Sequence, residues 1–420
     1  MGRHAGVRVL VVTAGSVGDV MPYTGLGVRL REAGHEVVLA THAGFETLVR
    51  ARGLGFRPLP VDPRAELASA GGQELARAGN GPAAMVSLMR MAREFAPELC
   101  RGVLAAVEQG ADAVLLSTSL ARPGHLVTRA LDVPGMGVYL QPWAPTGDFP
   151  SAVFGGGRSL GRWANRASGH AVLALLDRVY ATGVRDLRTH LGLPKGADRG
   201  SVRRESGAWP VRYAYSPTVV PRPADWPAAA QVAGYLWPAR AEGWSPDPRL
   251  TDFLQAGPPP VFIGFGSVVT DAGRLSRIAV DALRAAGVRG VVQAGWSGLR
   301  ACGDDVLTVG EVPHDWLFPR MSALVHAAGA GTTAAGLRAG VPAVPVPVQL
   351  DQTFWAARLT ALGVSPGPVP FRRLTAERLA EAIRRAVGTP GYRTRARDLA
   401  GRIAAEDGAG QVVEAVGRLG

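Results

Sequence analysis

The first half of the chain alternates short, continuous apolar runs with longer segments of helical periodicity. Residues 7–13 are apolar at nearly every position, which is typical of a strand covered on both faces. The next segment predicts a helix that begins near Pro22 and ends at Gly34, and residues 36–40 form a second apolar run. This alternation with Gly-rich joints predicts a parallel sheet with helices on both faces.

The second half repeats this scheme. Strands are predicted at residues 261–266, 291–293, 306–309, 323–326 and 344–348, with helices between them and a helical tail at 375–387, 392–405 and about 410–419. Residues 217–227 are Pro-rich and give a poor helix or strand signal. We therefore predict two doubly wound α/β domains, at residues 1–220 and 234–404, with a linker at 221–233 and a C-terminal helix at 405–420.

Residues 311–364 carry the strongest chemical signal. A strand that ends at His326 is followed by the loop 327–331, built only of Ala and Gly, and by a helix that Thr332 opens and Gly340 closes. A loop without bulky side chains lets the backbone approach a ligand, and a helix start presents unpaired N–H groups and the positive end of its dipole. The pattern predicts a phosphate site, to which the His326 ring can donate a further hydrogen bond.

Asp351 and Gln352 follow the next strand and precede a helix predicted at 353–362. Their side chains could hold hydroxyl groups beside the phosphate, which indicates a nucleotide-linked sugar. A second interpretation stays open, because Gly329-x-Gly331-x-x-Ala334 with Asp351 about twenty residues further on matches the dinucleotide fingerprint and would indicate NAD. That fingerprint normally opens its domain, whereas strands at 261 and 291 precede it here.

Asp19 lies just beyond the end of the first strand. Ligands of parallel α/β sheets bind beyond the C-terminal ends of the strands, so this carboxylate is a candidate general base. The alternative is a helix cap or first-turn acid, which is common before a helix that begins with Pro. The residues alone leave the two roles equally open.

Several apolar side chains are candidates to contact an apolar ligand. Met85 and Met89 could line an adaptable pocket, although their spacing is more typical of a core. From residue 143 to about 169 the pattern fades into a long loop, and its aromatic residues either contact a ligand or hold the loop on the domain. The candidate set is Met21, Met85, Met89, Trp143, Phe149 and Phe154, with Trp163 as a further aromatic of this loop.

These motifs resemble the GT-B glycosyltransferases of family 1, in the bacterial branch of antibiotic, macrolide and sterol-type glucosyltransferases that includes the glycopeptide enzymes. The resemblance is strong over residues 311–364 and 15–22, and weak over 67–208. It is carried by VPHDWLFPR, HAAGAGTT, GLRAGVP, the Asp351–Gln352 pair and GSVGDVMP. The chain departs from the family at Ala327 and Ala328, where His and Gly are usual, and at Val17, where Arg is frequent.

The resemblance implies two Rossmann-like domains that face each other across a cleft. It implies transfer of a hexose from a nucleoside diphosphate sugar, UDP-glucose being the first expectation, to a hydroxyl of a hydrophobic acceptor. Asp19 is then the base of an inverting displacement that needs no metal or other cofactor, and the last helix crosses back to the first domain. The implied donor contacts are Ser267, Trp296, Val312, His326, Gly329, Ala330, Gly331, Thr332, Asp351 and Gln352.

Composition adds bounds on partners and compartment. The formal net charge is +12, but the Arg residues are spread along the chain, which favours a solvated basic surface over a nucleic-acid partner. Cys100 and Cys302 lie in different halves without metal-ligand spacing, as expected of inert thiols in a reducing cytoplasm. No secretory pattern and no apolar run of about 18 residues is present. We predict a cytoplasmic monomer or homodimer without a transmembrane segment.

Two rival functions remain at this point. One is an NAD-dependent enzyme that uses the Gly329–Ala334 pattern. The other is a non-catalytic protein that binds nucleotide sugars or lipids, which the departures at Val17, Ala327 and Ala328 keep open.

Overall fold

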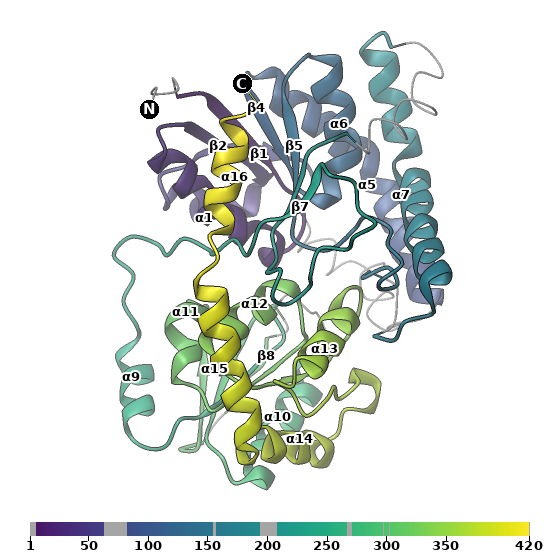
Figure 1. Cartoon of the computed structure of the whole chain (residues 1–420). Helices are drawn as coiled ribbons and strands as arrows, with labels where there is room; N and C mark the ends of the chain where they lie inside the picture. Colours follow the sequence, from purple (N-terminus) through teal and green to yellow (C-terminus); the bar gives the residue numbers. More distant parts are fainter. Residues whose placement is uncertain are drawn as a thin grey trace.

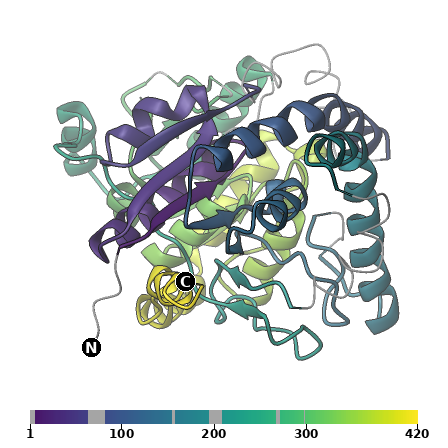
Figure 2. The ribbon, with the colours of Figure 1, turned by 90° about the horizontal axis from the view of Figure 1, so that it is seen from above.

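Two parallel sheets form the framework of the molecule (Figure 1). The computed structural model describes residues 6–62, 82–153, 157–193, 208–266, 271–296, 298–301 and 303–419. Figure 2, seen from above, shows the first domain lying over the second. The predicted pair of doubly wound α/β domains is confirmed.

The first sheet has the strand order β3-β2-β1-β4-β5-β6-β7. Its strands are β1 (Arg8–Val12), β2 (Glu36–His42), β3 (Gly55–Leu59), β4 (Ala113–Leu116), β5 (Gly135–Tyr139), β6 (Val211–Tyr213) and β7 (Ala230–Val232). Its helices are α1 (Val17–Glu32), α2 (Glu46–Arg50), α5 (Pro82–Glu108), α6 (Ala121–Ala130) and α7 (Arg162–His190), with short 3-10 turns at Ala43–Phe45 and Thr118–Leu120. The central strand β1 pairs in parallel with β2 and β4, and four of its five side chains are fully buried.

The second sheet has the order β10-β9-β8-β11-β12. Its strands are β8 (Val261–Gly264), β9 (Gly290–Gln293), β10 (Val306–Val309), β11 (Ala323–His326) and β12 (Ala343–Pro345). The helices are α9 (Pro248–Gln255), α10 (Ala272–Ala286), α11 (His314–Leu317), α12 (Ala330–Ala339), α13 (Gln352–Ala361), α14 (Ala376–Gly388), α15 (Pro390–Ala404) and α16 (Gly408–Val416), with 3-10 turns at Phe318–Arg320 and Phe371–Arg373.

The C-terminal helices join the two domains. Figure 1 shows α15 on the second domain and α16 on the first, both in yellow. Val412 and Val416 of α16 are buried in the hydrophobic cluster of β1 and α1. The guanidinium of Arg29 on α1 donates two hydrogen bonds to the carboxylate of Asp407, at 3.2 and 2.9 Å. The chain therefore passes between the two domains twice, once after β7 and once between α15 and α16.

Several predicted boundaries differ from the structure; helix α1 begins at Val17 rather than near Pro22, and β8 ends at Gly264 rather than at 266. Strand β7 lies inside the predicted linker 221–233 but pairs with β6, so the chain leaves the first sheet after Val232. Its pairing comes from a neighbouring strand, and three residues between Pro-rich segments carry no strand pattern of their own. Helix α7 begins at Arg162, inside the long loop predicted from residue 143 to about 169. Its first turn is exposed and has no apolar stripe, with Trp163 84% exposed, so the sequence carries no helix signal there. The last strand of the second sheet ends at Pro345 rather than at 348.

Candidate active site

Asp19 lies in the first turn of α1, directly after the turn that leaves β1. The Ser16 N–H and hydroxyl both donate to its Oδ2 atom, at 2.8 and 3.0 Å, in a capping box. The carboxylate is half-buried, and burial raises its pKa above the usual value. The capping role and the base role that the sequence left open are therefore compatible, since the cap engages Oδ2.

Asp351 approaches the same place from the second domain. It precedes α13, and the Trp355 Nε1–H donates to its Oδ2 at 2.8 Å. Burial raises its pKa to about 6, the negative charge of Asp19 adds to this increase, and a side-chain hydrogen bond with Gln141 works against it. The Asp19 carboxylate of the first domain therefore lies close enough to Asp351 of the second domain for its charge to act on that residue. Gln141 follows β5 on the first domain, and its side-chain amide oxygen lies 3.5 Å from the Thr118 hydroxyl.

His326 is buried at the end of β11 and has a defined tautomer. Its Nδ1 accepts the Ala328 N–H at 3.0 Å, so the neutral ring carries its proton on Nε2. Burial lowers the pKa of His326 to about 3, assisted by His314, so the ring is neutral at physiological pH. Nε2 has no hydrogen-bond partner among the described residues. A buried N–H donor without a partner is available to an anionic ligand.

The loop after His326 is shaped for close backbone approach. Gly329 is the N-cap of α12, so Gly331 and Thr332 lie in its first turn rather than before it. A Cβ added at Gly329 or Gly331 would meet no protein atom within 4 Å, and neither residue has a positive φ. Protein packing does not require glycine there, whereas a ligand on the helix N-terminus would.

Ala328 stands at the position where the resembling family usually has glycine. Its φ is +63°, in the left-handed region that glycine favours, and its methyl group is fully buried in the cluster that includes Trp355 and Phe354. The added Cβ therefore packs into this core cluster.

Gln352 folds back onto its own loop. Its Oε1 accepts the N–H groups of Val348 and Gln349, at 2.7 and 3.0 Å. The side-chain oxygen is engaged, so the amide NH₂ is the group that remains to donate to a ligand. Next to it, Leu350 has a φ of +53° and is 38% exposed.

The other predicted donor contacts are spread along the second domain. Trp296 is partly buried against the hydrophobic cluster of β1, α1 and α16, and its backbone N–H donates to the Gly266 carbonyl at 3.0 Å. Val17 packs against the same cluster. Val312 packs against the cluster of α11 and β9 and lines a cavity of about 270 Å³ together with Trp244 and Glu311. Ser267 lies outside the described residues.

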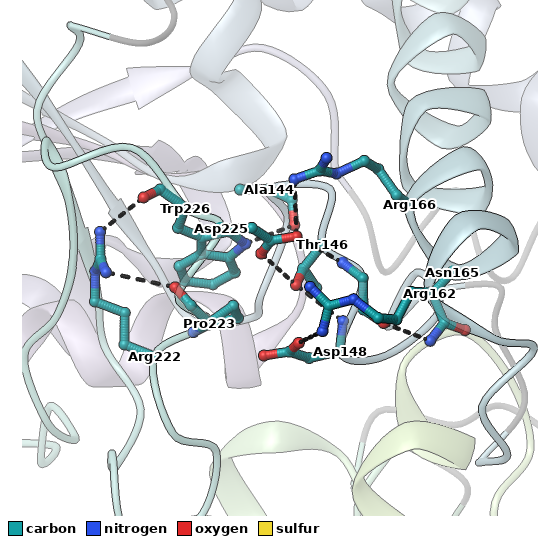
Figure 3. Close-up of polar contacts among 11 residues, drawn as sticks. Ala144, Thr146, Asp148, Arg162, Asn165, Arg166, Arg222, Pro223, Asp225 and Trp226 are labelled. Carbon is teal, nitrogen blue, oxygen red and sulfur yellow. Dashed lines mark hydrogen bonds and ion pairs between the residues drawn. The ribbon is translucent and has the colours of Figure 1, made fainter.

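A hydrogen-bond network holds the long loop between β5 and α7 in place (Figure 3). Asp225 accepts the Thr146 hydroxyl at 2.7 Å, the Gly147 N–H at 2.8 Å and the Arg166 guanidinium at 2.8 Å. The buried Asn165 donates to the Gly147 carbonyl and accepts the Leu160 N–H, both at 2.9 Å. Both ends of the loop are thus anchored by polar side chains from outside it.

The residues predicted to contact an acceptor differ in how they are packed and how far they are exposed. The Phe149 ring lies 5.4 Å from the Phe354 ring of α13, so it ties the loop to the second domain. Trp143 packs beside the same cluster, and its buried Nε1–H has no partner among the described residues. Met21 and Met89 are partly exposed. Phe154 and the side chain of Met85 lie outside what the structure describes.

The set of candidate site residues did not include Gln141, although the strand end at Gln141 was expected to face the same cleft as Asp19, and it did not include His42. Both follow or end strands of the first sheet, on the same edge as Asp19. The strand-end rule that selected Asp19 would also have selected His42. Cys100 is buried, and burial raises the pKa of its thiol to about 12, as expected of an inert residue. Cys302 lies outside the described residues.

Comparison with known proteins gives the class of this site. Residues 9–147 match the glycosyltransferase family 28 N-terminal domain, and residues 288–419 match the erythromycin biosynthesis protein CIII-like C-terminal domain. The glycosyltransferase SnogD from Streptomyces nogalater has the same fold, with a TM-score of 0.69 at 21% identity and with 99% of this chain and 100% of that chain covered.

Two relatives narrow the family. The chain is 38% identical to the O-mycaminosyltylonolide 6-deoxyallosyltransferase of Streptomyces fradiae, over 96% of this chain and 95% of that protein. It is 33% identical to a sterol 3-beta-glucosyltransferase of Arabidopsis thaliana, over 98% of this chain and 68% of that protein. The chain belongs to the GT-B glycosyltransferases, in the family of these macrolide and sterol enzymes. Its Gly329–Ala334 pattern is accordingly part of a glycosyltransferase domain.

The described ranges contain neither a membrane-spanning helix nor a metal cluster. No helix among them combines the length and the apolar character needed to cross a bilayer. The same ranges hold no group of His, Cys, Asp and Glu side chains suited to a metal ion.

We expect Asp351→Asn to stabilise the free protein at neutral pH. The pKa of Asp351 is raised from 3.8 to about 6, so ionisation lowers the free energy of unfolding as the pH rises through this window. Asparagine removes this cost, and its Oδ1 can still accept the Trp355 N–H. The shift corresponds to an upper limit of about 3 kcal/mol, and solvent screening reduces our expectation to about 1–2 kcal/mol. Denaturant unfolding at pH 8 and pH 4 measures the difference.

The gain should be present at pH 8 and absent near pH 4. Asp398→Asn, on the exposed face of α15, is the matched surface control and should change stability at neither pH. An equal effect of Asp351→Asn at both pH values would show that its cause is packing and not charge.

Proposed function

We propose that this enzyme transfers a hexose, glucose in the first instance, from a uridine diphosphate sugar to a hydroxyl of an apolar polycyclic or macrocyclic acceptor. The observation that carries the proposal is that Asp19 and Asp351, from opposite domains, lie close enough for the charge of Asp19 to act on Asp351. In this proposal, Asp19 activates the nucleophile and Asp351 holds the sugar. The N-terminus of α12 and His326 lie at the adjoining strand end.

In the proposed step, the Asp19 carboxylate accepts the proton of the acceptor hydroxyl while the oxygen of that hydroxyl attacks the anomeric carbon of the sugar. The bond from that carbon to the diphosphate oxygen breaks, and the electron pair leaves with the nucleoside diphosphate. The N–H groups at the start of α12 and the His326 Nε2–H stabilise the charge that develops there. A single displacement of this kind inverts the anomeric carbon.

The sugar class and the acceptor class have separate support. Asp351 accepts hydrogen bonds and the Gln352 amide donates them, which favours a hexose that keeps its hydroxyl groups. The names of the two relatives specify a sterol with glucose and a macrolide with 6-deoxyallose. Both acceptors are large and apolar, which supports this acceptor class here.

Thermal shift and turnover test the proposal together. We would measure melting with UDP, TDP, UDP-glucose and NAD at millimolar concentration, and then sugar release with a sterol and with a macrolide aglycone. A shift with UDP and UDP-glucose, followed by release that depends on an acceptor, is expected. A larger shift with TDP would replace the uridine assignment. A shift with NAD alone, or donor binding without release to any acceptor, would contradict the proposal.

A further inference from the structure

His42 lies at the end of β2, next to the turn that carries Asp19. The residue is 3% exposed. Its Nε2 accepts the Gly15 N–H at 3.0 Å, and its Nδ1 lies 2.7 Å from the Val61 carbonyl oxygen. A carbonyl only accepts, so Nδ1 carries the proton and donates it. One neutral tautomer therefore serves both contacts.

Gly15 connects this imidazole to the carboxylate of Asp19. Its φ is +139°, and an added Cβ would lie 2.5 Å from the Asp19 Oδ2. The Asp19 side chain therefore rests directly against the Gly15 backbone, and the next N–H along the chain, that of Ser16, donates to the same Oδ2. His42 thus fixes the Ala14–Gly15 peptide, which directly precedes the Gly15–Ser16 peptide whose N–H holds the carboxylate.

The surroundings keep His42 uncharged. Burial lowers its pKa, against the opposing effects of the Val61 and Pro60 carbonyls and of the Asp62 carboxylate. The Phe45 ring covers another side, 6.5 Å away. Protonation of Nε2 would also turn this nitrogen into a donor that faces the Gly15 N–H, so two donors would point at each other. Val61 holds its carbonyl toward His42 with a φ of +77°, which is rare for a β-branched residue.

We propose that His42 is a positioning residue for Asp19. By accepting the Gly15 N–H, His42 fixes the turn against which the Asp19 side chain rests, and so the direction in which the carboxylate meets the acceptor hydroxyl. The inference rests on the proposed role of Asp19 as the base. It predicts that the hydrogen-bond acceptor at the Nε2 position is the essential feature of residue 42. The donor toward Val61 orients the ring.

Two amide substitutions separate these features. The side-chain oxygen of His42→Gln reaches the Nε2 position and can accept the Gly15 N–H, whereas the shorter His42→Asn reaches only the Nδ1 position. We expect His42→Ala and His42→Asn to lower kcat at least about tenfold, because small misplacements of a catalytic group are costly. His42→Gln should stay within about threefold of the parent, and the donor KM should not change in any of the three.

A double-mutant cycle with Asp19→Asn identifies the route of the effect. If His42 acts through Asp19, His42→Ala should lower kcat in the parent and not in the Asp19→Asn background. The matched control is Thr41→Val, one residue earlier on β2, because Thr41 is fully buried and its hydroxyl has no partner among the described residues. It should leave kcat unchanged, and melting temperatures verify that each variant is folded.

The outcomes separate this proposal from the proposed function. Full activity of Asp19→Asn would remove the base assignment, whatever His42 does. An inactive Asp19→Asn with a fully active His42→Ala would overturn the positioning role alone. Folded His42→Gln and His42→Ala variants with equal losses would overturn it as well, as would additive losses in the cycle.

Discussion

Replacing Asp19 with asparagine is expected to lower kcat by about a hundred- to ten-thousand-fold, the usual contribution of a positioned general base. The amide keeps the shape of the side chain, and its oxygen can still accept the Ser16 N–H that now lies 2.8 Å from Oδ2. Fold and donor binding should therefore be retained. Steady-state kinetics, with donor affinity from calorimetry, separates loss of chemistry from loss of binding.

The pH profile gives a second view of the same residue. Burial raises the pKa of Asp19, so the acid limb of kcat/KM should lie above the ordinary range for an aspartate, with activity rising as the carboxylate ionises. Glu32→Gln, at the exposed end of α1, is the matched loss of a carboxylate and should have parent kinetics. Parent turnover by Asp19→Asn would exclude the base role.

Replacing Gly331 with alanine is expected to weaken donor binding at least about tenfold while slightly stabilising the free protein. Alanine is favoured over glycine inside a helix by about 0.5–1 kcal/mol, and the added Cβ meets no protein atom within 4 Å. That same open space above the first turn of α12 is where the donor diphosphate is proposed to lie. Opposite changes in stability and affinity are the signature of a glycine kept for a ligand.

Gly401→Ala on α15 is the matched control for this pair of effects. Gly401 also lies within a helix, it is exposed, and a Cβ added there would meet no atom within 4 Å. The substitution should give the same gain in melting temperature with unchanged affinity for the nucleoside diphosphate. If Gly331→Ala binds the donor as tightly as the parent does, the diphosphate does not rest on this helix turn.

Much of the fold follows from local patterns in the sequence. The apolar run at β1 and the strand that ends at His326 are buried on both faces, so nearly every position must be apolar. The helix after His326 ends as predicted at Gly340, whose φ of +66° is the left-handed cap that glycine accommodates. Asp19, His326 and Asp351 could also be selected as candidate site residues from the sequence, because strand ends mark ligand sites in such sheets.

Other features depend on partners that are distant in the chain. Ala230–Val232 is a strand because β6 lies beside it, and α16 is held on the first domain by Val412 and the Arg29–Asp407 pair. Such pairings leave no periodic pattern in the segments themselves, so the predicted linker was misplaced.

The sequence by itself determined the two α/β domains, the glycine turn at α12 and the residue types of the site. The tertiary structure decided which of them act together. It set Asp19 and Asp351 within electrostatic reach across the domains, and it fixed His42 and His326 as opposite tautomers. Periodicity reports whether a side chain is buried, because burial depends on the local element. Coupling and tautomer depend on which atoms of other elements lie within a few ångströms, and only the packed domains bring those atoms together.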